Sequence, residues 1–227
     1  KSLVQYYEPM YCSSGGINLK RQVNMKAQRV HRYAGKLSES ARKRIARCVT
    51  LMLQAYPGKW INNPVTERKQ FHRLSFVTLT IPETDENLTA REAYDKLLKH
   101  FLQWLRRTEG VKTYIWKAEL QQRGQIHYHI TTPSFIHYQS IRDKWNNLMR
   151  QAGLLDNFRK KYGHENPNST DIHSVRKLDN IEAYLTKYLC KSEQNQTATS
   201  GKLWDCSENL KSFKYYSSPV ELHNKAE

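Results

Sequence analysis

The feature that most constrains the fold is a regular succession of strand and helix patterns between about residues 72 and 191. Strand patterns rich in β-branched and aromatic residues cover residues 74–81, 112–120 and 125–132. Apolar residues at helical spacing cover residues 89–110 and 141–153, and each of these stretches ends at a glycine. A strand near residues 171–175 and a helix over residues 179–191 complete the series.

The order β-α-β-β-α-β-α predicts an α+β fold. We expect a ferredoxin-like or RRM-like βαββαβ core, with an antiparallel sheet, helices on one face, and an added C-terminal helix that carries tyrosines. The other sheet face is expected to be free for chemistry. Residues 71–192 would form this core, residues 1–70 a basic and partly helical N-terminal region, and residues 193–227 a linker and a tail that packs on or near the core.

The charge of the chain indicates a polyanionic partner. Its 227 residues include 37 Lys and Arg against 21 Asp and Glu, a formal charge of +16. Nucleic acid fits this charge better than an anionic membrane, because no apolar run approaches the length of a membrane span and no signal segment is evident. We therefore expect an intracellular nucleic-acid-binding protein. Basic candidates for phosphate contacts cluster at Arg42, Lys43, Arg44 and Arg47.

A His-x-His strand is the sharpest local motif. Because strand side chains alternate, His127 and His129 share one face, and a three-residue loop at 122–124 places Glu119 opposite His127. Two imidazoles and a carboxylate suit Mg²⁺ or Mn²⁺, and no cysteine lies near them in the sequence. The alternative is that these are exposed strand residues without a metal.

Two threonines are expected to share this face. If the strand at residues 74–81 is central, Thr78 and Thr80 alternate onto the histidine side. They would then hydrogen-bond a metal ligand or the DNA backbone, although β-propensity alone also explains them.

The last helix pattern contains two tandem Tyr-x-x-Lys units. Helical spacing places Tyr184, Lys187, Tyr188 and Lys191 in one stripe, with two phenols flanked by two ammonium groups. A nearby cation favours the phenolate, which is the nucleophilic form. The alternative is an amphipathic helix with tyrosines in the core and lysines that extend to solvent.

These three motifs together resemble the HUH endonucleases, specifically the two-tyrosine rolling-circle replication initiators. The strand 76–80, the His127–His129 strand and the tyrosine helix 184–191 follow the same order, and residues 201–207 resemble a segment found after the third motif. The resemblance implies that His127, His129 and Glu119 bind Mg²⁺ or Mn²⁺. It also implies that a tyrosine attacks single-stranded DNA, leaves a 5′-phosphotyrosine and a free 3′-OH, and that the same site rejoins strands.

The resemblance further implies an origin or terminal DNA hairpin as substrate, with a host DNA polymerase and helicase as partners. Two alternatives stay open. A rolling-circle transposase would use the same chemistry, and an RRM-like protein would bind single-stranded nucleic acid without cleaving it. The RRM-like alternative predicts aromatic residues where the chain has His127, His129 and Glu119.

Overall fold

The structure is a computed structural model that describes residues 37–63, 66–83, 88–120, 125–175, 185–186, 189–190 and 201–212. The chain divides into two compact units, Lys1–Ala34 and Gly35–Glu227, and every described residue belongs to the second unit. None of the helices in the described ranges has the length and apolar character that crossing a membrane requires.

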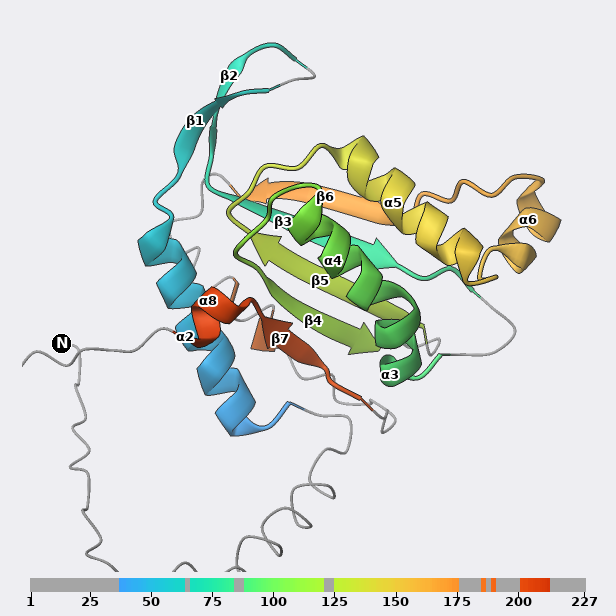
Figure 1. Ribbon diagram of the computed structural model, residues 1–227, viewed down its shortest axis with the longest axis horizontal. Coiled ribbons are helices and arrows are strands. Elements are labelled where there is room, and N and C mark those ends of the chain that lie inside the picture. The colour runs from blue at the N-terminus through green and yellow to red at the C-terminus, as the bar shows by residue number, and fades with distance from the viewer. Residues whose placement is uncertain are drawn as a thin grey trace, which may run out of the picture. The chain divides into compact units, whose positions relative to one another are not determined.

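A five-stranded antiparallel sheet forms the centre of the fold (Figure 1). Its strands follow the order β6-β3-β5-β4-β7. Their bounds are β3 Leu74–Thr80, β4 Ile115–Leu120, β5 Ile126–Thr132, β6 Thr170–Val175 and β7 Trp204–Cys206. The α+β prediction is confirmed, although the strand expected over 112–120 begins only at Ile115.

One face of the sheet is covered by two helical segments. The first comprises α3 Ala90–Ala93, a π-helical turn Tyr94–Leu98 and α4 Lys99–Arg107, and the second is α5 Tyr138–Gln151. Thr89 begins the first segment with the predicted capping box, in which its side chain and that of Glu92 bond each other's backbone N–H. The main core lies between this layer and the sheet and includes Trp116, Tyr128 and Trp145.

Helix α2 Glu39–Ala55 packs against part of the other sheet face. Ser38 caps its first turn by accepting a hydrogen bond from the Ala41 N–H. Ile45, Val49 and Met52 are fully buried in a second core, which also contains strand residues Leu74, Phe76 and Ile115. The expectation that this face is free is therefore wrong at the apolar end of the strands, where uncovered side chains would leave apolar surface in water.

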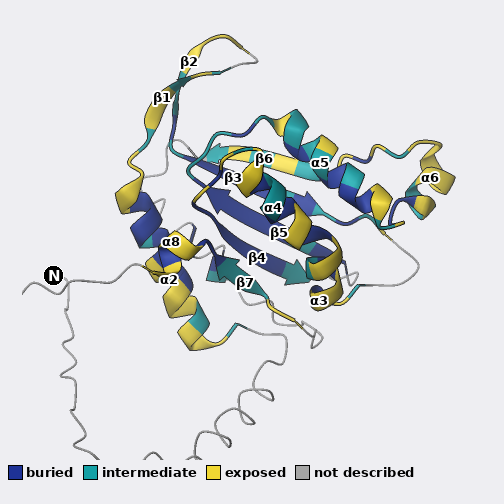
Figure 2. Cartoon of the chain, in the orientation of Figure 1, coloured by how far each residue is buried: buried dark blue, intermediate teal, exposed yellow. Residues whose placement is uncertain are grey.

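The C-terminal part of the described chain joins α2 and the sheet. Strand β7 extends the sheet at β4, and the short helix α8 Glu208–Lys211 follows it. The Sγ atoms of Cys48 in α2 and Cys206 in β7 lie 3.7 Å apart. The Arg44 guanidinium lies 5.5 Å from the ring centroid of Trp204. Figure 2 shows that α2 turns its buried side towards this part of the molecule.

The structure contains two features that the sequence patterns did not predict. The first is a hairpin of β1 Lys59–Asn62 and β2 Lys69–His72, which forms its own two-stranded sheet. The second is helix α6 Asp156–Tyr162. The strands of the hairpin have only four residues each and α6 buries no residue, so neither has a clear apolar periodicity to detect.

Candidate functional site

Polar side chains from four adjacent strands lie on the sheet face opposite α4 and α5. Strand pairing places Glu119, His127 and Thr80 in one row across β4, β5 and β3. The next row contains Lys117, His129, Thr78 and Asp171, across β4, β5, β3 and β6. We call these two rows the histidine face. The predicted pairing of Glu119 with His127 is confirmed.

Three neighbours fix the orientation of the His129 ring. Its Nε2 lies 2.5 Å from Glu119 Oε2, and its Nδ1 lies 3.2 Å from Thr78 Oγ1. The Phe76 ring stacks on it, with centroids 5.6 Å apart and an interplanar angle of 19°. Because a carboxylate only accepts hydrogen bonds, Nε2 donates to Glu119, and in a neutral ring Nδ1 then accepts from the Thr78 hydroxyl.

Glu119 therefore contacts His129 diagonally and not the residue opposite it. The His129 side chain is 3% exposed and that of Glu119 is 18% exposed, so the contact is largely shielded from water. A hydrogen bond to a charged group is stronger in such a setting than at the surface. The pairing register alone does not predict this diagonal contact, because it depends on side-chain rotamers.

His127 lies half-buried beside this pair. Its ring centroid is 6.5 Å from that of His129. Burial lowers the pKa of His127, the positive charge of a protonated His129 lowers it further, and the Glu119 carboxylate opposes both effects. His127 is therefore neutral at pH 7, which is the form in which imidazole binds a metal ion.

Sequence reasoning assigned no role to three other residues on this side of the sheet. Lys117 lies directly beside His129 in the strand pairing and is only 3% exposed. Asp171 lies beside Thr78, and its Oδ2 is 2.7 Å from Nε2 of His173. Strand alternation placed Lys117 on this face, but the position of Asp171 depends on how β6 pairs with β3, which requires the tertiary structure.

The donor set suits a hard divalent ion, but it is only partly converged. Neutral imidazole and carboxylate oxygen are ligands for Mn²⁺ and Mg²⁺. The donors of Glu119 and His129 meet at 2.5 Å. Within the described residues, no three His, Cys, Asp or Glu side chains are close enough together to hold a metal ion. The residues therefore fit the ion by chemistry, and binding would require a side-chain rearrangement that brings in His127.

The predicted tyrosine stripe lies outside the described residues. Tyr184, Lys187, Tyr188 and Lys191 belong to it, so their side chains are not described. Their neighbours Leu185 and Leu189 are helical and fully buried in the same core as Phe76. These leucines anchor the predicted third motif to the sheet face that carries the histidines.

Cys190 gives a second point of contact for this segment. Burial raises the pKa of its thiol, and the positive charges of Lys117 and Arg42 act in the opposite direction. Its Sγ also lies 3.6 Å from the Arg42 carbonyl oxygen. A cysteine therefore adjoins the Lys117 row of the histidine face, contrary to the expectation from sequence distance. The chain folds Cys190 back across the sheet, which linear spacing does not reveal.

The basic candidates of the N-terminal region lie on exposed positions of α2. Arg42, Lys43, Arg44 and Arg47 are all exposed. Lys43 forms an ion pair with Glu39 at 2.8 Å, and Arg44 lies over Trp204. Surface ion pairs of this kind contribute little to stability, so they leave the positive charge available to phosphates.

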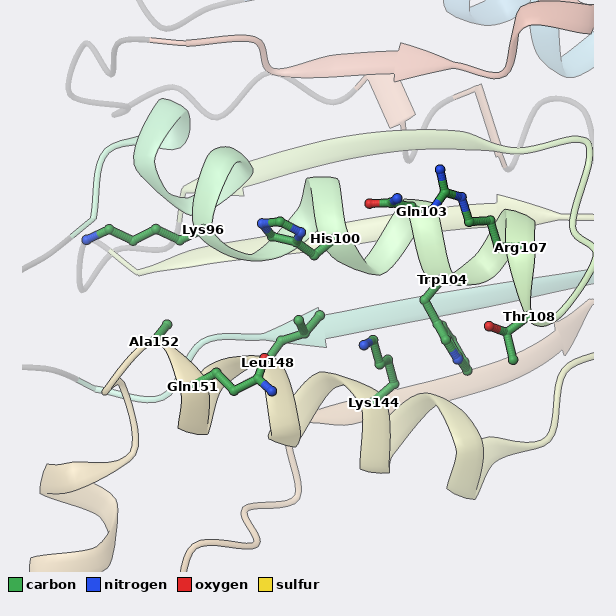
Figure 3. A pocket seen from close by; sticks show the side chains of 10 residues that line it. All are labelled: Lys96, His100, Gln103, Trp104, Arg107, Thr108, Lys144, Leu148, Gln151 and Ala152. Atoms are coloured by element: carbon green, nitrogen blue, oxygen red, sulfur yellow. The ribbon is translucent and has the colours of Figure 1, made fainter.

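A separate polar cavity of about 630 Å³ lies between α4 and α5 (Figure 3). Its lining includes the basic residues Lys96, His100, Arg107 and Lys144. These helices cover the opposite side of the sheet from His127 and His129, so the cavity is not part of the histidine face.

Comparison with known proteins places the chain in a class. The model of a family of replication-associated proteins, described as the ORF2 type, matches residues 74–193, more than half of the chain. This match extends from β3 through β6 and includes His127, His129 and the helical leucines. The chain belongs to this replication-associated family, which links it to DNA and its replication. Neither the curated proteins nor the solved structures contain a significant match.

Proposed function

We propose that this protein is an HUH endonuclease of the two-tyrosine type, which nicks and rejoins single-stranded DNA to initiate rolling-circle replication. The observation that carries the proposal is the buried Glu119–His129 contact beside His127, on a sheet face of a replication-associated chain. An RRM-like binding face would carry stacking aromatics at these positions instead.

In this proposal His127, His129 and Glu119 hold Mg²⁺ or Mn²⁺. When bound, the ion polarises the scissile phosphate and offsets the negative charge that develops on its oxygens. Thr78 and Phe76 keep the His129 ring in one orientation. Thr80 lies beside His127 in the next row and is available to the DNA backbone. Such supporting contacts affect metal binding almost as strongly as the ligands do.

A tyrosine of the third motif supplies the nucleophile. Its phenolate oxygen forms a bond to phosphorus while the bond from phosphorus to the 3′ oxygen breaks. The 3′ oxygen takes a proton and leaves as a hydroxyl, and the 5′ phosphate stays on the tyrosine. Lys187 and Lys191 favour the phenolate by their charge. Because the phosphotyrosine keeps the energy of the phosphodiester bond, a 3′-OH can reverse the step and join strands.

The test is cleavage of a single-stranded suicide oligonucleotide with mass mapping of the covalent adduct. We expect a divalent-ion-dependent adduct on Tyr184 or Tyr188. Replacing His127 and His129 together by Ala should abolish the adduct and leave DNA binding largely intact. His100→Ala is the matched control, because this exposed histidine lies on α4 across the sheet. Undiminished nicking by the double variant in EDTA would contradict the metal-dependent mechanism.

The same assay separates the remaining alternatives. Binding without any adduct, in the presence of Mg²⁺ or Mn²⁺, would favour a non-catalytic RRM-like protein. A transposase would share the adduct but join transposon ends, whereas an initiator acts at an origin or terminal hairpin and leaves a 3′-OH that a host polymerase and helicase use. Membership in a replication-associated family favours the initiator.

A further inference from the structure

The β1–β2 hairpin is a basic and aromatic element that the proposed chemistry does not use. It forms a separate two-stranded sheet and extends away from the five-stranded sheet (Figure 1). Residues 59–73 contain four Lys and Arg but a single acid, Glu67. Lys59, Arg68 and Lys69 are exposed, and none has an ion-pair partner within the described ranges. Their charge is therefore available to an external anion.

Trp60 gives the hairpin a second property. It is 71% exposed, the most exposed large hydrophobic side chain in the described part of the chain. Strand pairing places Asn62 and Lys69 on the same face of the hairpin as Trp60. An indole ring beside ammonium and amide groups is the chemistry that binds an unpaired nucleotide, because the ring stacks on the base and the cation contacts the phosphate.

The indole is supported from below. The Phe71 ring lies edge-on to Trp60, with centroids 5.9 Å apart and an interplanar angle of 69°. Gly58 has a φ of +109°, and a Cβ atom there would lie 2.3 Å from the Phe71 ring. A glycine is therefore required beneath Phe71. This packing holds Trp60 outwards on a firm base, which reduces the entropy lost when a base stacks on it.

The hairpin also lies in line with the histidine face. Chain from Phe71 runs through Arg73 directly into β3, and seven residues separate Phe71 from Thr78. At roughly 3.3 Å per residue this corresponds to about 23 Å. Stacked nucleotides rise about 3.4 Å each, so the span matches about seven nucleotides.

We propose that the β1–β2 hairpin is a second single-stranded-DNA-binding element, in which Trp60 stacks on an unpaired base and Lys59, Arg68 and Lys69 contact the neighbouring phosphates. This inference rests on the proposed function for its choice of DNA as the ligand. It adds a binding site about seven nucleotides from the cleaved phosphate. The hairpin thus extends the contacts to the flank of the substrate.

The test compares a long oligonucleotide, which covers both the cleavage site and its flank, with a short one that covers the cleavage site alone. Trp60→Ala should weaken binding of the long strand by about tenfold, the loss expected for one stacked base. It should not change binding of the short strand. Trp60→Phe should recover most of the affinity. Tyr162→Ala is the matched control, because Tyr162 is a 53% exposed aromatic residue on α6.

Photocross-linking gives an independent readout. Iodouracil placed at successive positions should cross-link Trp60 at about seven nucleotides from the cleaved phosphate. Equal affinity of Trp60→Ala and wild type for the long strand would overturn the inference. So would a loss confined to double-stranded DNA, because the hairpin would then bind a paired stem. Absence of nicking in the wild type, with Trp60-dependent binding intact, would count against the proposed function and not against the hairpin.

Discussion

At the residue scale, the contacts of His129 explain why Thr78 matters. The Thr78 hydroxyl is the partner of Nδ1, so it determines which ring nitrogen faces Glu119 and is available for a metal ion. Thr78 itself projects from a central strand, where its rotamer is restricted by the packed sheet. A small hydroxyl therefore controls the orientation of a proposed ligand.

Thr78→Val should consequently reduce nicking at low metal concentration while the protein remains folded. We expect the concentration of Mn²⁺ that gives half-maximal nicking to rise by about tenfold or more, as for other residues that support a metal ligand. Thr131→Val is the matched control. It removes a buried hydroxyl on the same side of β5 that has no hydrogen-bond partner among the described residues. Equal metal dependence of the two variants would show that Thr78 does not orient His129.

The division of labour between the two tyrosines is also a residue-scale prediction. On the helix predicted over residues 179–191, positions 184 and 188 are about 40° apart in projection and roughly 6 Å apart along the axis. Both phenols could reach one phosphate, but not from the same attack position. Tyr184 borders the basic side of the predicted stripe, whereas Tyr188 borders the apolar side. A neighbouring cation lowers the pKa of a phenol and burial raises it.

We therefore expect Tyr184 to make the first cut and Tyr188 to carry out strand transfer. Tyr184→Phe should lose most nicking, measured as covalent adduct. Tyr188→Phe should nick but fail in successive transfers, measured by joining of a second labelled strand. The reverse pattern would exchange the two roles. Unfolding of Tyr188→Phe would show that this residue belongs to the core.

At the element scale, β7 depends on ion pairs formed by Asp205. Lys202 Nζ lies 2.6 Å from its Oδ2, and Lys211 Nζ lies 3.2 Å from its Oδ1. Burial alone would raise the pKa of Asp205. Hydrogen bonds from Lys202, the Cys206 N–H and Lys211 outweigh burial, and the pKa lies below its usual value. The ionised carboxylate thus stabilises the packing of β7 and α8.

The sign of the pH effect follows from this lowered pKa. The stabilisation is fully present above the pKa of an unfolded aspartate, about 3.9, and is lost as the pH falls through the lower pKa of the folded protein. Asp205→Asn should therefore lower the midpoint of urea unfolding at pH 7. The difference from wild type should shrink as the pH is lowered below about 4. A constant difference across that range would show that the ion pairs do not contribute.

At the scale of the whole molecule, a formal charge of +16 governs how the protein meets DNA. Binding through phosphates releases counterions, so affinity for single strands falls as salt rises. Even three phosphate contacts predict a loss of more than about tenfold between 50 and 200 mM salt. Measuring the dissociation constant across this range tests the prediction. An affinity that is flat with salt would show that the charge is not used on DNA.

The origin of that salt dependence can be mapped on the surface. Replacing Arg42 and Arg47 of α2 together by Gln should reduce the slope of log affinity against log salt by about 1.4, or about 0.7 for each phosphate contact. The matched control replaces Lys160 and Lys161 of α6 by Gln, which removes the same charge from another exposed helix. Equal effects of both pairs would indicate non-specific attraction and no binding by α2.

Local chemistry was readable from the sequence by itself. Alternation predicted the strands, and apolar spacing and capping predicted α2 and the helix that begins at Thr89. The loop length predicted the pairing of Glu119 with His127. These features depend on residues close together in the chain, so their patterns carry enough information. The hairpin and α6 were missed because both are short and mostly exposed.

Tertiary structure decided which of these groups touch. Glu119 bonds His129 diagonally, Phe76 stacks on that ring, and Asp171 comes to lie beside Thr78. Helix α2 and Leu185, more than a hundred residues apart in sequence, share one core. Such contacts depend on rotamers, on the order of strands and on the burial of apolar faces, which are set by packing across the whole domain. A pattern of neighbouring residues cannot contain them.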